Sequence, residues 1–250
     1  MIVKNEEEVL GRCLDSVAGF PDEILVTDTG STDGTKAAAM EPRKAKDEPR
    51  DTGLLNLVAA MERGARVFDF PWRDDFAAAR NFSFSQGRGT YLFWMDADDV
   101  VRPDQRRKLL DLKERLGRAD CLPDVVMMKY AAAFRRDGSL AAAFYRERLI
   151  RRGTGAVWKG RVHETVQPFG IIWKEDIWIE HRKMRIRDPE RNLRILESMR
   201  KNGEEFGPRE QYYYEMERAF ARRCQETALE NGQLLTRPGN ERFVNGRYLW

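Results

Sequence analysis

The sequence predicts an α/β fold with a mixed sheet, and three observations support this prediction. Short apolar runs alternate with amphipathic helical patterns through the first half of the chain, which is typical of βαβ units. Two of these runs, 23–27 and 91–95, pass directly into polar or acidic segments. Ligands bind at the carboxyl ends of strands in open α/β sheets, so both segments are candidate sites. After residue 125 the pattern changes to hairpins, which makes the predicted sheet mixed.

Composition indicates a globular protein whose 250 residues form one large domain or a domain with an appendage. The net charge of +3 gives little reason to expect a nucleic-acid partner. Three widely spaced cysteines indicate reduced thiols and show no zinc-binding spacing. No apolar run approaches the ~18 residues of a membrane span, and the start lacks a signal-peptide pattern. We therefore expect a cytoplasmic protein with no transmembrane segment.

The segment Thr90–Val101 organises the predicted fold. Its apolar run indicates a strand buried on both faces. Side chains alternate along a strand, so Asp96 and Asp98 share a face and Asp99 begins the exit from the sheet. Clustered carboxylates favour a bound cation, and Mg²⁺ or Mn²⁺ takes such oxygen ligands together with substrate phosphates. The alternative is a solvated turn in which an aspartate caps the helix that starts near Pro103.

The N-terminal segment predicts two strands with a helix between them. Residues 1–3 look like the end of a strand, although three residues are few for a secure assignment, and Asn5 is a candidate cap of the following helix. The strand 23–27 enters the loop Asp28–Thr35, in which two glycines allow close backbone approach. This loop suits the polar groups of a nucleotide, although it contains neither a GxGxxG nor a Walker A pattern. An ordinary strand-to-helix turn is the alternative.

Between these strands and the acidic segment lie less regular patterns. The chain predicts a charged loop over 40–51, a short helix over 54–62 and an edge strand over 64–70. A helix over 76–84 carries Arg80 near its middle and leads into the acidic segment.

The second half predicts further strands and then helices. A glycine-punctuated loop over 153–160 leads to His163, and His181 is the second of two histidines in the chain. The predicted elements are a helix over 105–116, strands over 125–130, 171–173 and 177–180, a hairpin over 134–150 that turns at Asp137–Gly138, and helices over 189–201 and 208–229.

Five motifs occur in the order Met1–Glu7, Asp28–Thr35, Asp75–Asn81, Asp96–Asp99 and Val162–Glu164. Together they resemble the motifs of the family-2 inverting glycosyltransferases, which have a GT-A fold. Two later segments resemble the linker and first helices of the subgroup with tetratricopeptide-like repeats: Asp188–Leu193 and Pro208–Tyr214.

The resemblance spans about residues 1–220 and has implications for the whole architecture. It implies the Rossmann-like mixed sheet of a nucleotide-diphospho-sugar transferase with a short C-terminal helical extension. The implied division is a GT-A domain over 1–187, a truncated helical extension over 188–231 and a poorly structured tail over 232–250.

The resemblance also implies a role for each matching residue. Asp96 and Asp98 match the DxD element, in which the second aspartate binds Mn²⁺ or Mg²⁺ and the first lies nearer the sugar or ribose. Glu164 stands where the family has its catalytic base, and His181 where many GT-A enzymes have a late histidine on the metal or diphosphate. The remaining matches contact the base and ribose or supply a basic residue near the nucleotide: Val3, Asn5, Asp28, Thr29 and Arg80.

The implied function is metal-dependent, inverting transfer of a sugar from a UDP-sugar to a hydroxyl or thiol on a peptide, a glycan or a lipid-linked acceptor. The C-terminal helices are candidates for homo-oligomer contacts. The alternative is a catalytically degenerate module that binds nucleotides or proteins, because the first strand is short and the repeat pattern lapses after about residue 215. A nucleotidyltransferase is disfavoured because Lys4–Glu8 is too acidic for a triphosphate loop.

Overall fold

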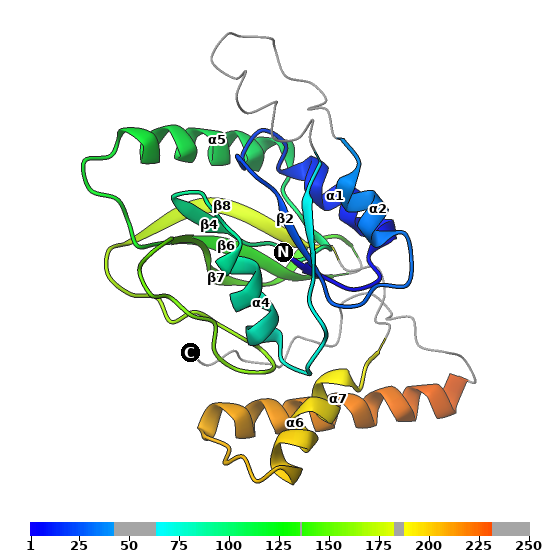
Figure 1. Ribbon diagram of the computed structural model, residues 1–250. Helices are drawn as coiled ribbons and strands as arrows, with labels where there is room; N and C mark the ends of the chain where they lie inside the picture. The colour runs from blue at the N-terminus through cyan, green and yellow to red at the C-terminus, as the bar shows by residue number, and fades with distance from the viewer. Residues whose placement is uncertain (43–63, 136, 183–187, 232–250) are drawn as a thin grey trace.

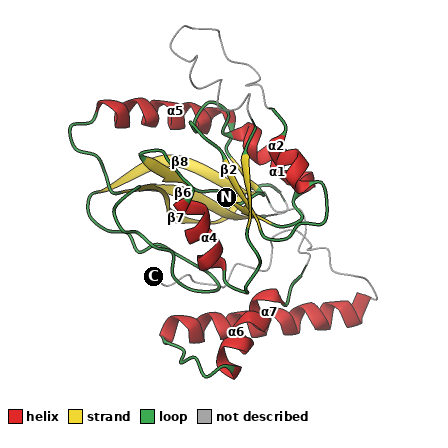
Figure 2. Ribbon diagram, viewed as in Figure 1, coloured by secondary structure: helices red, strands yellow, loops and turns green. Residues whose placement is uncertain are grey.

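The computed structural model describes residues 1–42, 64–135, 137–182 and 188–231 (Figure 1). Strands lie at its centre, with α5 (Pro103–Arg118) above β8 (Ile172–His181) and the helix pair α1 (Glu7–Ser16) and α2 (Thr35–Met40) beside β2 (Leu25–Asp28) (Figure 2). The arrangement is the mixed α/β architecture that the sequence predicts.

Three parallel strands carry the N-terminal part of the fold. They are β1 (Ile2–Val3), β2 (Leu25–Asp28) and β3 (Arg66–Asp69), in that spatial order. Val3 pairs with Asp28, and Asp28 pairs with Asp69, so the three strands end at the same edge. Buried side chains of α1, α2 and the strands form the supporting core, including Leu10, Leu14, Val26 and Ala39.

A second sheet within the described residues has five strands. They are β4 (Tyr91–Phe93), β7 (Leu140–Arg151), β6 (Val125–Phe134), β8 and β5 (Asp99–Val100), in that spatial order. The β6–β7 and β4–β7 pairs are antiparallel, the β6–β8 pair is parallel and the β5–β8 pair is antiparallel, so this sheet is mixed as predicted.

The strand pattern of the second half differs from the predicted one in two places. The hairpin turns at Gly138 as predicted. The strand predicted over 125–130 is longer, because β6 runs without a break from Val125 to Phe134 and forms the first strand of the hairpin. The two short strands predicted over 171–173 and 177–180 form one strand, β8. Its pairing with β6 shifts at one point, since Met128 pairs with Glu175 while Lys129 pairs with Trp178. This bulge lies between the two predicted runs and interrupts the period-2 pattern of the sequence there.

Helix α4 (Phe76–Ser85) begins at a side-chain cap, since the carboxylate of Asp75 accepts a hydrogen bond from the backbone N–H of Ala78 at 2.8 Å. The cap predicted for α1 is wrong. Asn5 adopts a left-handed backbone with φ of 55° and its Oδ1 accepts from the N–H of Thr32 at 2.7 Å, so its side chain ties two loops together instead.

The C-terminal extension consists of α6 (Arg191–Lys201) and α7 (Pro208–Asn231), which lie together below the sheets in Figure 1. Their apolar side chains pack on one another and on the first domain in a cluster that includes Val162, Trp72, Phe76, Ile195, Leu196, Met199 and Tyr214. The extension is therefore held against the domain by a shared core, and homo-oligomer formation through these helices remains a prediction.

Among the described residues, no helix combines the length and the apolar character that crossing a membrane requires. Cys13, Cys121 and Cys224, which all lie in the described part of the chain, form no disulfide. The predicted helix over 54–62, the junction at residue 187 and the tail over 232–250 lie outside the described residues.

Candidate active site

A cavity of about 580 Å³ opens where the strand ends of both sheets meet. The N-terminal strand, α4, the acidic segment, the loop before Thr165 and the end of β8 all contribute to its walls. Eight of the nine predicted site residues line it: Val3, Asn5, Thr29, Arg80, Asp96, Asp98, Glu164 and His181.

Backbone contacts between the first two strand ends build one wall. The carbonyl of Val3 accepts hydrogen bonds from the backbone N–H and the hydroxyl of Thr29, both at 2.9 Å. The backbone N–H of Asn5 donates to the hydroxyl of Ser31 at 2.8 Å. The two loops therefore form one polar surface.

Asp28 is the predicted site residue that does not line the cavity. Its side chain is buried, and Oδ1 accepts from the N–H groups of Gly30 and Ser31 at 2.9 Å each. Gly30 has φ of 101°, which an L side chain rarely adopts, so the glycine and the carboxylate together shape the turn. Contact between Asp28 and a nucleotide remains a prediction.

Asp96 is held by arginine. Its Oδ1 lies 2.7 Å from a terminal nitrogen of Arg80. Burial acts to raise the pKa of Asp96, but the positive charges of Arg80 and Arg148 outweigh it and hold this pKa well below its usual range. Asp96 is therefore a permanent carboxylate at neutral pH.

Asp99 was predicted to begin the exit from the sheet, but it lies fully buried in β5. Its Oδ2 accepts from Arg148 at 2.8 Å and from the backbone N–H of Asp96 at 3.1 Å. The capping alternative is wrong as well, because the residue before α5 is Arg102 and α5 has no side-chain cap. The acidic segment is a partly buried, hydrogen-bonded turn.

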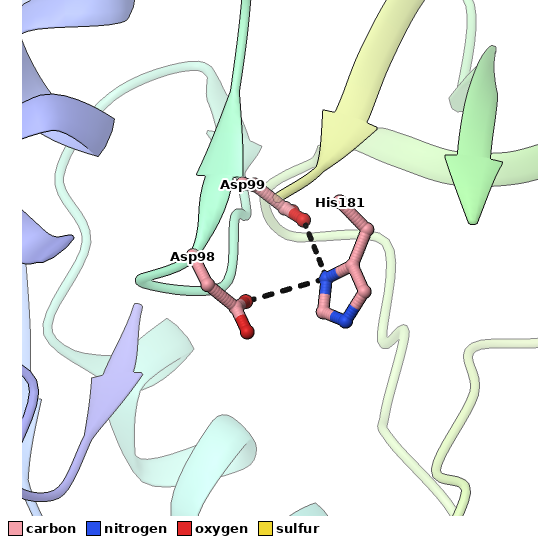
Figure 3. Close-up of side chains that lie close together, drawn as sticks. All are labelled: Asp98, Asp99 and His181. Atoms are coloured by element: carbon pink, nitrogen blue, oxygen red, sulfur yellow. Dashed lines mark hydrogen bonds and ion pairs between the residues drawn. The ribbon is translucent and has the colours of Figure 1, made fainter. Parts of the chain in front are cut away.

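His181 faces the acidic segment from the end of β8 (Figure 3). Its Nδ1 lies 3.3 Å from Oδ1 of Asp98 and 3.4 Å from Oδ1 of Asp99. Burial lowers the pKa of His181, but hydrogen bonds and charge from these two aspartates outweigh it and raise the pKa to about 9. The metal-free protein therefore carries an imidazolium here at neutral pH.

One ligand atom from each of Asp98, Asp99 and His181 lies within 4.8 Å of the other two. Two carboxylate oxygens and an imidazole nitrogen suit Mn²⁺, and the carboxylates also suit Mg²⁺. A cation among these atoms would replace the proton that Nδ1 shares with the two aspartates. The residues present thus fit the metal site predicted from Asp98 and His181, with Asp99 as a third donor.

Glu164 and Asp96 are joined through Arg80, whose Nε donates to Glu164. The Arg80 guanidinium lies 4.6 Å from the ring centre of Trp94 and 4.9 Å from that of Trp158. Burial lowers the pKa of Arg80, but the two carboxylates outweigh it and raise it above the ordinary value. Arg80 is therefore a fixed charge that orients both carboxylates, as well as a basic wall of the cavity.

Several cavity residues were not predicted: Trp72, Tyr130, Arg146, Arg191 and Asn192. The sequence does contain a signal for Arg146, because the charged run Arg146–Arg148 interrupts an otherwise apolar strand pattern. Arg191 and Asn192 come from α6, and no local pattern shows that this helix returns to the cavity.

The geometry defines a cavity with a polar loop wall, an acidic group suited to a cation and, in the wall, the carboxylate of Glu164. The family model "Glycosyl transferase family 2" matches residues 1–178. The chain belongs to glycosyl transferase family 2, and the GT-A fold predicted from the sequence is confirmed.

Two relatives are similar to parts of this chain. A TPR repeat-containing protein of Synechococcus elongatus is 35% identical over 120 residues, which are 47% of this chain and 25% of that protein. The lipopolysaccharide core biosynthesis glycosyltransferase LpsC of Rhizobium meliloti is 30% identical over 181 residues, which are 69% of this chain and 57% of LpsC. The chain thus spans only part of the length of these relatives.

Among solved structures, TarS 1-349 of S. aureus in complex with UDP is 14% identical. The match covers 92% of this chain and 72% of that chain, with a TM-score of 0.49.

Proposed function

We propose that this protein is a metal-dependent, inverting glycosyltransferase that moves a sugar from a UDP-sugar to a hydroxyl or thiol acceptor. The observation that carries the proposal is the convergence of Glu164, the Asp98–His181 pair and the polar wall at Val3 and Thr29 on one cavity. Membership of glycosyl transferase family 2 supports the reaction class.

In the proposed reaction, Glu164 removes the proton of the acceptor as the acceptor attacks the anomeric carbon of the donor. A bond forms from the acceptor oxygen or sulfur to that carbon, and the carbon–oxygen bond to the diphosphate breaks on the opposite face. UDP leaves with the bonding electrons. The transition state is oxocarbenium-like, by analogy with glycoside hydrolysis.

The other residues bind and orient. Val3, Asn5 and Thr29 hold the nucleoside, with Asp28 shaping the loop beneath it. Asp96, fixed by Arg80, lies on the sugar or ribose side. Asp98, Asp99 and His181 would hold Mn²⁺ or Mg²⁺, which when bound would supply positive charge beside the departing diphosphate.

The test measures the release of UDP from a panel of UDP-sugars and of GDP from GDP-mannose, with Mn²⁺ or with EDTA. Water serves as a slow acceptor, so no acceptor has to be known beforehand. The expected result is metal-dependent release of UDP from at least one UDP-sugar. The second candidate, a degenerate nucleotide-binding module, predicts UDP binding in a thermal-shift assay with no release from any donor.

A further inference from the structure

Helix α7 contacts the residue that precedes Glu164 in the chain. Nε2 of His163 shares a hydrogen bond of 2.7 Å with Oε1 of Glu217. The His163 ring stacks on Tyr213 with a centroid separation of 4.0 Å and an interplanar angle of 14°. The backbone carbonyl of His163 accepts from Arg209 at 2.6 Å. Three side chains of one helix therefore hold the ring and the backbone of a single loop residue.

His163 needs such support because its backbone is left-handed, with φ of 55°. The loop ends are also joined, since the N–H and carbonyl groups of Lys159 and Thr165 form reciprocal hydrogen bonds of 3.0 and 3.1 Å. Between these ends the loop bends at Gly160, which has φ of 94°. The direction in which Glu164 leaves the loop is thus fixed by the pair at its ends and by α7.

Glu217 is well placed to hold His163. It is 8% exposed, and its carboxylate also accepts from the side-chain amide of Asn192 in α6 at 2.9 Å. Burial acts to raise the pKa of Glu217, but hydrogen bonds from His163 and Asn192 together with nearby positive charge lower it. The carboxylate therefore stays charged while joining both helices of the extension to the loop.

We propose that His163 is a positioning residue for Glu164, and that the C-terminal extension fixes the catalytic carboxylate through Glu217 and Tyr213. The inference rests on the proposed function of Glu164. By this inference the C-terminal helices help to position Glu164, whereas the sequence suggested only an appendage. Neither Glu217 nor Tyr213 lines the cavity, so their loss should leave nucleotide binding intact.

The experiment uses the full 250-residue chain and steady-state UDP release from the UDP-sugar that turns over, with Mn²⁺. Glu217→Ala and Tyr213→Ala should each lower kcat by roughly 10–100-fold, because small misplacements of a reacting group cost about this much. KM for the donor should stay within about twofold. Glu217→Gln keeps the acceptor oxygen and Tyr213→Phe keeps the stacked ring, so both should retain kcat within about threefold.

Wild-type kcat in the two alanine variants would overturn the inference. Equal losses of kcat in the alanine and conservative variants would also overturn it, because the loss would then not follow the contact to His163.

Hydrogen–deuterium exchange provides a readout that does not depend on turnover. In Glu217→Ala the backbone amides of residues 160–166 should exchange faster than in the wild type, while β6 keeps its protection as a control for folding. Unchanged protection over 160–166 would refute the holding role of α7. If the wild type released no UDP from any donor, the proposed function would fail, and the exchange result would still decide whether α7 holds the loop.

Discussion

Arg80 and Glu164 form a buried ion pair at the cavity wall, and the same guanidinium binds Asp96 at 2.7 Å. One arginine thus links the proposed base to the first aspartate of the DxD element. Because Arg80 is also enclosed by Trp94 and Trp158, it has little freedom to follow one carboxylate and release the other. The spacing of the two carboxylates is therefore built into the protein before any substrate binds.

Replacing Glu164 by glutamine should lower UDP-sugar turnover by roughly 10²–10⁴-fold, because the amide cannot accept the acceptor's proton. The amide oxygen can still accept from Arg80, so we expect the fold and UDP affinity to be retained. Glu204→Gln is the matched control, since Glu204 pairs with Arg161 and does not line the cavity. Wild-type turnover in Glu164→Gln would remove this residue from the base role.

Arg80→Met should lower the free energy of unfolding by about 3–5 kcal/mol, because the buried carboxylate of Glu164 and the partly buried one of Asp96 lose their shared cation. Arg80→Lys should lose less, since an ammonium can still pair with one of them. Chemical denaturation measures both. Arg118→Met, which breaks an exposed pair with Glu114, should change stability by less than about 0.5 kcal/mol. Equal effects at the two sites would show that Arg80 has no special structural role.

Asp98→Ala should reduce the affinity for UDP in Mn²⁺ to the affinity seen in EDTA, because the variant loses a carboxylate that faces His181. Isothermal titration with UDP, with and without Mn²⁺, measures the difference. Asp176→Ala is the control, since Asp176 pairs with Lys108 and Lys129 away from the cavity. Unchanged metal-dependent affinity in Asp98→Ala would argue against metal binding at this residue.

The sequence indicated the strand ends and the acidic segment because those features are local. Asp96 and Asp98 both line the cavity, but strand alternation is not the reason, because β4 ends at Phe93 and Ala97 lines the cavity too. The same early end of the strand explains Asp99, since the turn that follows β4 is held by Arg148 from a distant strand.

Contacts between distant segments account for the other differences. The glycine-punctuated loop over 153–160 is tied to α4, because Trp158 is buried and exchanges two hydrogen bonds with Asn81. The contact of His163 with Tyr213 joins residues fifty positions apart. Neither contact leaves a periodic signal in the chain, because each depends on how separate elements pack.

The raised pKa of His181 gives the metal site a pH dependence of definite sign. The unperturbed value of 6.5 rises to about 9 in the folded, metal-free protein. The charged imidazole therefore adds stability that is complete below pH 6.5 and is lost as the pH rises through about 9. Since a metal ligand must be a neutral imidazole, Mn²⁺ has to displace this proton.

Mn²⁺ binding at pH 7 should therefore release about one proton per ion, and apparent affinity should rise by up to about tenfold per pH unit between pH 7 and pH 8.5. Titration calorimetry at pH 7 in buffers of different ionisation enthalpy measures the released proton directly. His181→Ala removes the titrating group, so its binding should be weaker and nearly independent of the buffer. Buffer-independent heats in the wild type would show that Mn²⁺ binds without displacing the His181 proton, and the imidazole would then not be a ligand.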